Sequence, residues 1–560
     1  MPSSTEDTSR QTREVERTPG TIHLIDADGH ISGKHVEGSG ATRGVVLVPA
    51  PSKHPDDPLN WSPRRKKLAA FCMAFYVLVI GICSSALYST LGPLSQATGL
   101  SYNDLNYGTG YMFLFLGWGC VFWSAVATQY GKRPIYLITL AGTLGTMVWQ
   151  PHISTNGEWI AAKMLQGLFG APMESIAEVT VSDIFFTHER GTYMAVYALA
   201  LGYSNGIAPL IMGFINQGMG YQWVFYWCAI FCAIALVLLF FCMEETKFDR
   251  AGHVITAQNL RRPEDGGNEA KAQEDEEKKA DANLDLTTSH VAQATLDSTI
   301  HKKSYFDKLK PIGSAGFKQR NYVGRLLVVP FELLSFSIIV YAGFLYGSNI
   351  IWLSVLNATE SMILSQNPYN MGSNDVGLTF IAPLIGTTLA ACFTGLFGDR
   401  FMLWKARRNG GTFEAEHRLW LFVPSLALIP FGCILYGLGA YHHAHWFAIV
   451  FAMGVISFTT TAGSQMSIAY IVDCYRDMSN ETLAAVIFIR NTMSFGIGYA
   501  VTPWVTKLGY QNAFILGAFL GLSHNLTIFP VIRWGRSLRQ KSANRYWRKV
   551  EKHEMAGLTH

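Results

Sequence analysis

Residues 64–91 of the 560-residue chain read RRKKLAAFCMAFYVLVIGICSSALYSTL. Four basic side chains precede an apolar run, over 68–91, that contains no charged residue. An α-helix needs about 20 consecutive apolar residues to cross the hydrocarbon core of a bilayer. Because Lys and Arg near the end of a span stay on the cytoplasmic side, this stretch predicts a membrane-spanning helix that enters from the cytoplasm.

Runs of the same kind recur along the chain. They cover 68–91, 107–128, 134–152, 158–182, 191–215 and 222–243, and then 325–352, 374–398, 418–440, 446–470, 482–505 and 511–533. Only 15% of the residues are charged, whereas soluble proteins have about 25%. We therefore predict an all-α integral membrane protein with twelve transmembrane helices in two six-helix halves. The same composition excludes a soluble multidomain enzyme.

The basic residues alternate between successive loops. Lys132 and Arg133 lie between runs two and three, Arg190 lies between four and five, and a basic cluster over 405–418 lies between eight and nine. The loops on the opposite side contain almost no Lys or Arg. This asymmetry predicts that both termini and the segment 244–322 are cytoplasmic. The net charge of +4 is too small to indicate a nucleic-acid partner.

Charge and hydropathy divide the chain into five predicted parts. These are a disordered N-terminal tail (1–67), a six-helix half (68–243), a linker (244–322), a second six-helix half (323–535) and a C-terminal tail (536–560). The linker is too polar to bury a core of its own. Asn103-Asp104 before the second run recurs as Asn374-Asp375 before the eighth, which supports two homologous halves.

Two carboxylates stand inside the predicted fourth span. Glu174 and Glu178 are four residues apart, so they share one face of a helix. A charge at bilayer depth is costly and normally faces a partner or a water-filled path. The pair therefore predicts proton binding coupled to transport, and attraction of a cationic substrate; the structural alternative is an ion pair with Lys163 or with an Arg on the gate side.

Other acidic residues stand near the predicted cytoplasmic ends of spans. Asp183 ends span four and Asp473 ends span ten, at corresponding positions in the two halves. We predict gating ion pairs built from Lys132, Arg133, Asp183 and Arg190 in the first half and from Asp399, Arg400, Asp473 and Arg476 in the second. Arg490 in span eleven is predicted to be a gate-helix residue or the counter-ion of Glu332 in span seven.

Neutral polar residues within spans are candidates for holding a substrate by hydrogen bonds. Together with the acidic residues, the predicted proton-coupling or substrate-binding set is Glu174, Glu178, Tyr203, Asn205, Glu332, Gln465 and Asn525. Gly202, Gly206 and Gly213 predict close helix packing in span five, where Pro209 predicts a bend.

One Asn-x-Ser/Thr sequence falls in a predicted external loop. Asn357-Ala358-Thr359 follows the run 325–352, so Asn357 is predicted to be glycosylated.

Four short motifs carry a family likeness. They are Gly-Lys-Arg-Pro at 131–134, Lys-Met-Leu-Gln-Gly-Leu-Phe-Gly at 163–170, the run with Gly and Pro at 202–213, and Gly-Leu-Phe-Gly-Asp-Arg at 395–400. With them the chain resembles the major facilitator superfamily, and within it the fungal twelve-span drug:H+ antiporter branch, over about residues 54–535. The likeness has a departure in the first half, where Thr128 and Gln129 stand in place of an acidic and a basic residue.

The resemblance implies alternating-access export of a drug, toxin, secondary metabolite or polyamine in exchange for protons. We expect a monomer in the plasma membrane, or alternatively the vacuolar membrane, with a small-molecule substrate, protons and the lipid bilayer as partners. Proton-symport import of an organic cation or nutrient is the second hypothesis, and a non-transporting sensor is the third. The chain has no phosphate-binding loop and no Cys or His spacing typical of a metal site, so we predict no enzyme activity, cofactor or metal.

Overall fold

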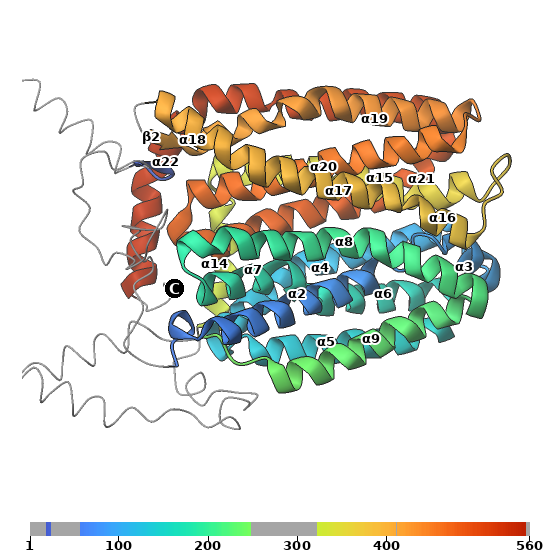
Figure 1. Cartoon of the computed structure of the whole chain (residues 1–560), viewed down its shortest axis with the longest axis horizontal. Coiled ribbons are helices and arrows are strands. Elements are labelled where there is room, and N and C mark those ends of the chain that lie inside the picture. Colours follow the sequence, from blue (N-terminus) through green and yellow to red (C-terminus); the bar gives the residue numbers. More distant parts are fainter. Residues whose placement is uncertain (1–17, 24–55, 248–321, 410–411, 556–560) are drawn as a thin grey trace, which may run out of the picture.

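The computed structural model describes residues 18–23, 56–247, 322–409 and 412–555. Long helices lie side by side along one direction and form the body of the molecule (Figure 1). Within the described ranges, nine helices are long and apolar enough to cross a membrane. The all-α membrane fold is thereby confirmed, while the count of twelve spans stays a prediction.

Three local features separate the observed helices from the predicted runs. The helix over Arg133–Trp149 has only 17 residues. The predicted fourth span is divided into two helices of 15 and 13 residues. The last two predicted spans belong to one helical segment, Ser479–Leu526. Its helical geometry is interrupted at Gly509, where φ is 73° and ψ is 162°. Glycine adopts such a positive φ without the steric cost of a side chain.

The first half of the chain, drawn from blue to green, occupies one side of the bundle in Figure 1. Its elements are η1 (Pro58–Asn60), α2 (Pro63–Ser85), α3 (Leu91–Thr98), α4 (Tyr102–Tyr130), α5 (Arg133–Trp149), η2 (Gln150–His152), α6 (Asn156–Gly170), α7 (Pro172–Ile184), α8 (Thr187–Met219) and α9 (Tyr221–Cys242). Buried apolar residues from these helices form one core.

The second half begins with α14 and continues to the red helix α22 (Figure 1). Its elements are α14 (Val323–Leu333), α15 (Ser337–Leu364), α16 (Ser373–Thr379), α17 (Ile381–Cys392), η4 (Phe393–Phe397), α18 (Gly398–Arg408), β2 (Thr412–Glu414), η5 (Ala415–Phe422), α19 (Val423–Tyr441), α20 (Trp446–Cys474), η6 (Arg476–Met478), α21 (Ser479–Leu526) and α22 (Ile528–Met555). Two further apolar cores lie within this half.

The corresponding Asn-Asp pairs of the two halves begin corresponding helices. Asp104 accepts a hydrogen bond from the Ser101 N–H (3.2 Å) at the start of α4. Asp375 accepts one from the Gly372 N–H (3.3 Å) at the start of α16. A carboxylate in the first turn satisfies a free backbone donor and favours the helix dipole. The repeated pair therefore performs the same local task in each half.

The two ends of the bundle differ. Helices α3 and α16 lie at one end, and α18, β2 and α22 lie at the other, where α22 runs across the direction of the bundle (Figure 1). We refer to them as the α16 end and the α22 end. At the α22 end, β1 (Thr21–His23) pairs antiparallel with β2, with Ile22 opposite Phe413. The N-terminal segment thus contacts the second half of the chain.

Candidate functional site

A cavity of about 140 Å³ lies between the two halves. Helices α2, α4, α7 and α8 line it from the first half, and α15, α20 and α21 line it from the second. Pockets that hold a drug-sized ligand have volumes of about 300–1,000 Å³. The cavity is therefore contracted in this conformation, and a substrate of that size requires the halves to separate.

A helix break positions Glu174 in the cavity wall. Pro172 lacks a backbone N–H and begins α7 immediately after α6 ends. The freed Leu168 carbonyl accepts a hydrogen bond from the Trp123 indole (2.8 Å), and the Ala171 carbonyl accepts one from the Cys120 thiol (3.2 Å). Glu174 consequently lies in the first turn of α7, where the positive end of the helix dipole favours a carboxylate.

Glu174 forms an ion pair with Arg490 of the opposite half. The Arg490 guanidinium also donates to the Tyr346 hydroxyl (2.9 Å), and the Asn491 amide donates to Glu174 Oε2 (3.0 Å). The pair is almost fully enclosed, with side-chain exposures of 7% and 3%. Gly117 of α4 makes room for it, because a Cβ there would lie 2.7 Å from the Asn491 Cβ. One buried pair therefore connects α7, α15 and α21.

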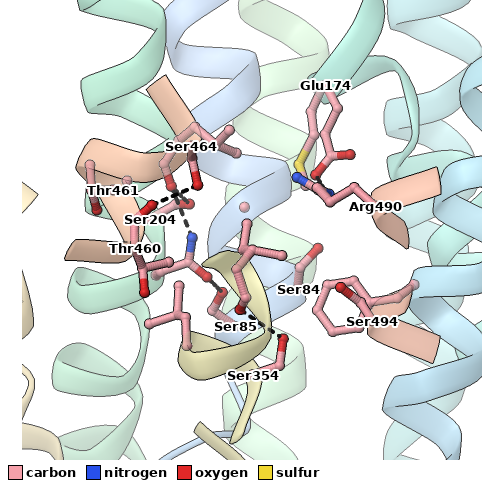
Figure 2. Close-up of a pocket in the computed structure, with 18 of the residues that line it drawn as sticks. Ser84, Ser85, Glu174, Ser204, Ser354, Thr460, Thr461, Ser464, Arg490 and Ser494 are labelled. Atoms are coloured by element: carbon pink, nitrogen blue, oxygen red, sulfur yellow. Dashed lines mark hydrogen bonds and ion pairs between the residues drawn. The ribbon is translucent and has the colours of Figure 1, made fainter. Parts of the chain in front are cut away.

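The opposite wall of the cavity consists of small hydroxyl side chains. Figure 2 shows Glu174 and Arg490 on one side, and Ser204, Thr460, Thr461 and Ser464 on the other. Many of these hydroxyls already donate to the backbone of their own helix; Ser464, for example, donates to the Thr460 carbonyl (2.7 Å). Their oxygens keep lone pairs that can accept from a ligand. The cavity thus combines one neutralised charge pair with a set of hydrogen-bond acceptors.

The structure gathers part of the predicted binding set at the cavity. Glu174, Asn205 and Gln465 line it, as does Arg490. Asn205 accepts from the Ser85 hydroxyl (2.8 Å), and Gln465 contacts Thr394. These four positions come from α7, α8, α20 and α21, so both halves contribute.

Two other predicted residues lie close to the cavity without lining it. Glu178 is buried one turn beyond Glu174 beside Tyr197. The Tyr203 hydroxyl shares a hydrogen bond with Thr388 of α17 (3.0 Å), so this side chain joins the two halves.

Two further predicted binding residues lie elsewhere. Glu332 is half-exposed on α14 and pairs with Lys549 of α22, not with Arg490. Asn525 is buried in α21, where its amide donates to the Gly521 carbonyl of its own helix (3.1 Å). Neither residue belongs to the cavity lining, so their assignment to it is corrected here. For Glu332 the physical reason is that the span begins only at Ser337.

Asn357 also requires a correction. The sequence places it in an external loop, but α15 continues to Leu364. Asn357 is buried and lines the cavity, so this position is not an exposed loop site for glycosylation. Hydropathy underestimates the helix because its last three turns contain polar side chains that face the protein interior rather than lipid.

The predicted gate residues of the first half lie together at the α22 end. Lys132 forms a buried ion pair with Asp183. The Arg133 guanidinium donates to the Phe240 carbonyl (2.7 Å) and is also buried. Arg190 belongs to α8, but its side chain lies outside the part that the structure describes.

In the second half, Asp473 pairs with Arg418 and more distantly with Arg476 (3.6 Å). Arg418 lies in η5, and its role as this partner is not predicted from the sequence. Arg400 is exposed at the start of α18. The side chain of Asp399 lies outside the described residues.

The predicted packing residues of α8 face the second half. A Cβ on Gly206 would lie 2.5 Å from Leu384, and one on Gly213 would lie 2.3 Å from the Ser373 carbonyl. A Cβ on Gly202 would lie 2.7 Å from Thr387. The Pro209 carbonyl accepts a hydrogen bond from the Ser89 hydroxyl (2.7 Å). Small residues therefore allow α8 to approach α16 and α17 closely.

Sequence reasoning missed most of the hydroxyl wall and Tyr346. The available signal was the density of small hydroxyl residues within apolar runs, namely Ser84-Ser85 in α2 and the run Thr459-Thr460-Thr461 in α20. Such hydroxyls also donate hydrogen bonds to backbone carbonyls of their own helix. Their presence in the sequence therefore does not show which of them face a cavity.

Comparisons with known proteins agree with this architecture. The family model described as Major Facilitator Superfamily matches residues 73–362. An uncharacterized MFS-type transporter of Schizosaccharomyces pombe is 31% identical over 95% of this chain and 94% of the relative. An efflux pump of Fusarium oxysporum is 21% identical over 95% of this chain and 84% of the relative.

A solved structure shows the same fold. The xylose transporter XylE of E. coli, in a partially occluded inward-open conformation, superposes with a TM-score of 0.53 at 12% identity, covering 83% of this chain and 99% of that one. The match of the family model over more than half of the chain, and the close relative in fission yeast, determine the assignment. The chain belongs to the major facilitator superfamily of membrane transporters.

Proposed function

We propose that the protein is a proton-coupled secondary transporter that exports small organic molecules, with the Glu174–Arg490 pair as its coupling element. The observation that carries this proposal is that one buried ion pair in the cavity wall joins the two halves. In alternating access the two halves rock against each other around a central site. A charge pair across that site resists their separation for as long as it is intact.

A proton and a cationic group of a substrate compete for the same carboxylate. When Glu174 is protonated, its attraction for Arg490 is lost, while Arg490 keeps Tyr346 and Asn491 as hydrogen-bond partners. When an amine of the substrate approaches, it substitutes for Arg490 at the carboxylate. Since only one of the two can neutralise Glu174 at a time, binding of one favours release of the other, which is the requirement for antiport.

The hydroxyl wall supports polar organic molecules as the substrate class. Ser204, Thr460 and Ser464 offer acceptors opposite the ion pair. Apolar side chains such as Leu116 and Ile350 complete the lining. An amphiphilic molecule can place an amine at Glu174 and an apolar body against the apolar side chains. A strongly anionic molecule would be repelled by the Glu174 carboxylate.

The direction of transport rests on orientation and on a relative. Basic residues concentrate at the α22 end, which the positive-inside rule assigns to the cytoplasm. The relative from Fusarium oxysporum is named an efflux pump. We extend that direction to this chain, in the plasma membrane.

Reconstituted protein with the pH dye pyranine inside the vesicles tests this function. Spermidine, as an organic cation, and fluconazole, as a neutral azole, are added outside. Exchange predicts that the lumen becomes alkaline as substrate enters and protons leave, whereas symport would acidify it. The sign of the pH change thus separates export by antiport from the alternative of proton-driven import.

Two matched variants locate the coupling. Glu174→Gln is expected to abolish the pH change in the lumen, because an amide side chain neither binds nor releases a proton near neutral pH. Glu332→Gln removes a carboxylate outside the cavity and is expected to leave the pH change intact. Equal loss in both variants, or an undiminished signal in Glu174→Gln, would contradict the role of Glu174.

A further inference from the structure

A second buried carboxylate lies outside the cavity, near the α16 end. Glu360 belongs to α15 and its relative exposure is 0%. Within the described part of the chain, it forms no ion pair with any Lys, Arg or His, and its Oε2 has no hydrogen-bond partner. A bare negative charge at such a position is strongly unfavourable. The group therefore needs another means of neutralisation.

The hydrogen bonds of Thr379 indicate how Glu360 is neutralised. The Thr379 hydroxyl lies 2.6 Å from the Val376 carbonyl and within hydrogen-bond distance of Glu360 Oε1. A hydroxyl has one proton to donate, and a carbonyl has none. If the hydroxyl donates to Val376, the second contact requires a proton from Glu360. Both contacts are satisfied together when Glu360 is the neutral acid and donates to Thr379.

The groups that face Glu360 within the described part of the chain are uncharged. From α16 it is faced by Thr379, and from α19 by Tyr436, which shares a hydrogen bond with Thr359 (3.3 Å). Asp375, the acid at the start of α16, is turned to the Gly372 N–H. Because these neighbours on α16 and α19 are neutral, the local charge depends on whether Glu360 carries its proton.

The helix that contacts Glu360 also closes the seam between the halves. In α16, a Cβ on Gly377 would lie 2.8 Å from the Pro209 carbonyl of α8. The Ser373 hydroxyl accepts from the Asn216 amide of α8 (2.9 Å), and its carbonyl abuts Gly213. Short, rigid α16 thus connects the carboxyl group at one end to the α8 seam at the other.

We propose that Glu360 is a proton-binding site that controls the α8–α16 seam. The neutral acid holds Thr379 and keeps α16 packed against α8; loss of the proton creates a charge that must be hydrated, and α16 moves away. Binding a proton from the α16 end therefore closes that end. The role of this site in driving transport rests on the function proposed above, whereas proton binding and seam closure do not.

Maleimide labelling of a cysteine in the seam tests the proposal without any transport substrate. Ser373→Cys is introduced in a background with Cys242→Ser and Cys392→Ser, because the other seven cysteines are buried. Ser373 itself is buried, so N-ethylmaleimide reaches it only when α16 parts from α8. Each rate is divided by that of the same protein unfolded in SDS, which removes the pH dependence of the thiol.

The corrected labelling rate is expected to rise by about tenfold between about pH 5.5 and about pH 8.5, as the open population grows with deprotonation. In Glu360→Gln the rate should stay at its low value throughout, because the amide cannot ionise. An unchanged pH profile in Glu360→Gln, or a flat profile in the parent protein, would overturn the proposal.

Two further variants keep the test decisive. Thr379→Val retains the carboxyl group but removes the acceptor of its proton, so the midpoint of the labelling profile should move to lower pH. Glu332→Gln, which removes a carboxylate that pairs with Lys549 at the α22 end, should leave the profile of the seam in place. If the pyranine experiment fails while the labelling result holds, the proposed function is wrong and the proton site remains; the reverse outcome rejects only the site.

Discussion

In the first half, Lys132 and Asp183 pair at the α22 end with side-chain exposures of only 4% and 5%. The corresponding pair of the second half, Arg418 and Asp473, is exposed by 22% and 10%. Both aspartates end the helix that precedes a cytoplasmic loop in the predicted topology, and both pair with a basic residue of another loop. The two halves therefore use one kind of contact at two depths of burial.

The surroundings of the two pairs differ as well. In the first half, the Glu245 carboxylate, which follows α9, accepts the N–H groups of Lys132 (3.0 Å) and Arg133 (3.1 Å), so the start of the predicted linker completes the corner. In the second half, Arg539 of α22 is fully buried against Glu416 and donates to the Pro19 carbonyl and the Thr21 hydroxyl. That corner depends on both terminal segments of the chain.

The comparison teaches where the α22 end is easiest to open. A deeply buried ion pair loses much when one partner is removed, because the other charge is left unpaired away from water. A partly exposed pair loses little, since water replaces the missing partner. The Arg418–Asp473 contact of the second half is accordingly the easier one to break, and the two terminal segments stabilise that corner.

The largest effect is expected from Asp183→Asn. It leaves the Lys132 ammonium buried without its counter-charge, and the free energy of unfolding should fall by about 3–5 kcal/mol. Thermal unfolding in detergent, followed by size-exclusion chromatography, measures it. The double variant Lys132→Met with Asp183→Leu, which removes both charges, should regain most of the loss; no recovery would show that packing and not charge is responsible.

Arg539→Ala should cost nearly as much, about 3 kcal/mol, because it leaves the Glu416 carboxylate, whose side chain is 4% exposed, buried without its counter-charge. The loss should be local. Hydrogen exchange is expected to increase in residues 18–23 and 412–416 and to stay unchanged around Lys132. Uniform acceleration over both halves would contradict the comparison.

Arg418→Ala tests the shallow pair directly. We expect a loss of about 1 kcal/mol or less, since the pair is partly hydrated and Arg476 already lies 3.6 Å from Asp473. The same unfolding measurement applies, with Asp183→Asn as the reference. A loss equal to that reference would show that the two corners are equivalent.

Thr21→Val, which removes one hydroxyl contact to Arg539 (3.2 Å), should cost about 0.5–1 kcal/mol. Hydrogen exchange of the β1–β2 pair is the sensitive measurement. Protection that survives in Thr21→Val would assign the docking of the N-terminal segment to its backbone.

The smallest effect concerns pH at α22. Lys549 holds the pKa of the Glu332 carboxyl, outside the span that begins at Ser337, below its ordinary value. A lowered pKa contributes stability that is present above the ordinary value of about 4.3 and is lost as the pH falls through the lowered one. Exchange of α22 should therefore increase only in acid, and Glu332→Gln should abolish that dependence.

Particular residues show how far sequence reasoning reached. Glu174 was identifiable because a carboxylate inside an apolar run is rare and costly. Asp183 was expected near Lys132, Arg133 and Arg190, and in the structure it forms an ion pair with Lys132. Asn357 was misplaced in a loop, because polar residues in the last turns of α15 lower the hydropathy although they face protein, not lipid. Glu360, in the same turns, was not identified from the sequence.

The sequence by itself determined that the chain is a helical membrane protein, that its basic residues favour one side, and that a few carboxylates lie at depth. These properties are local, because each segment bears its own cost of entering lipid. Only the tertiary structure decided the partners. Glu174 and Arg490 are 316 residues apart, and their pairing depends on how α7 and α21 pack across the two halves, which no local pattern encodes.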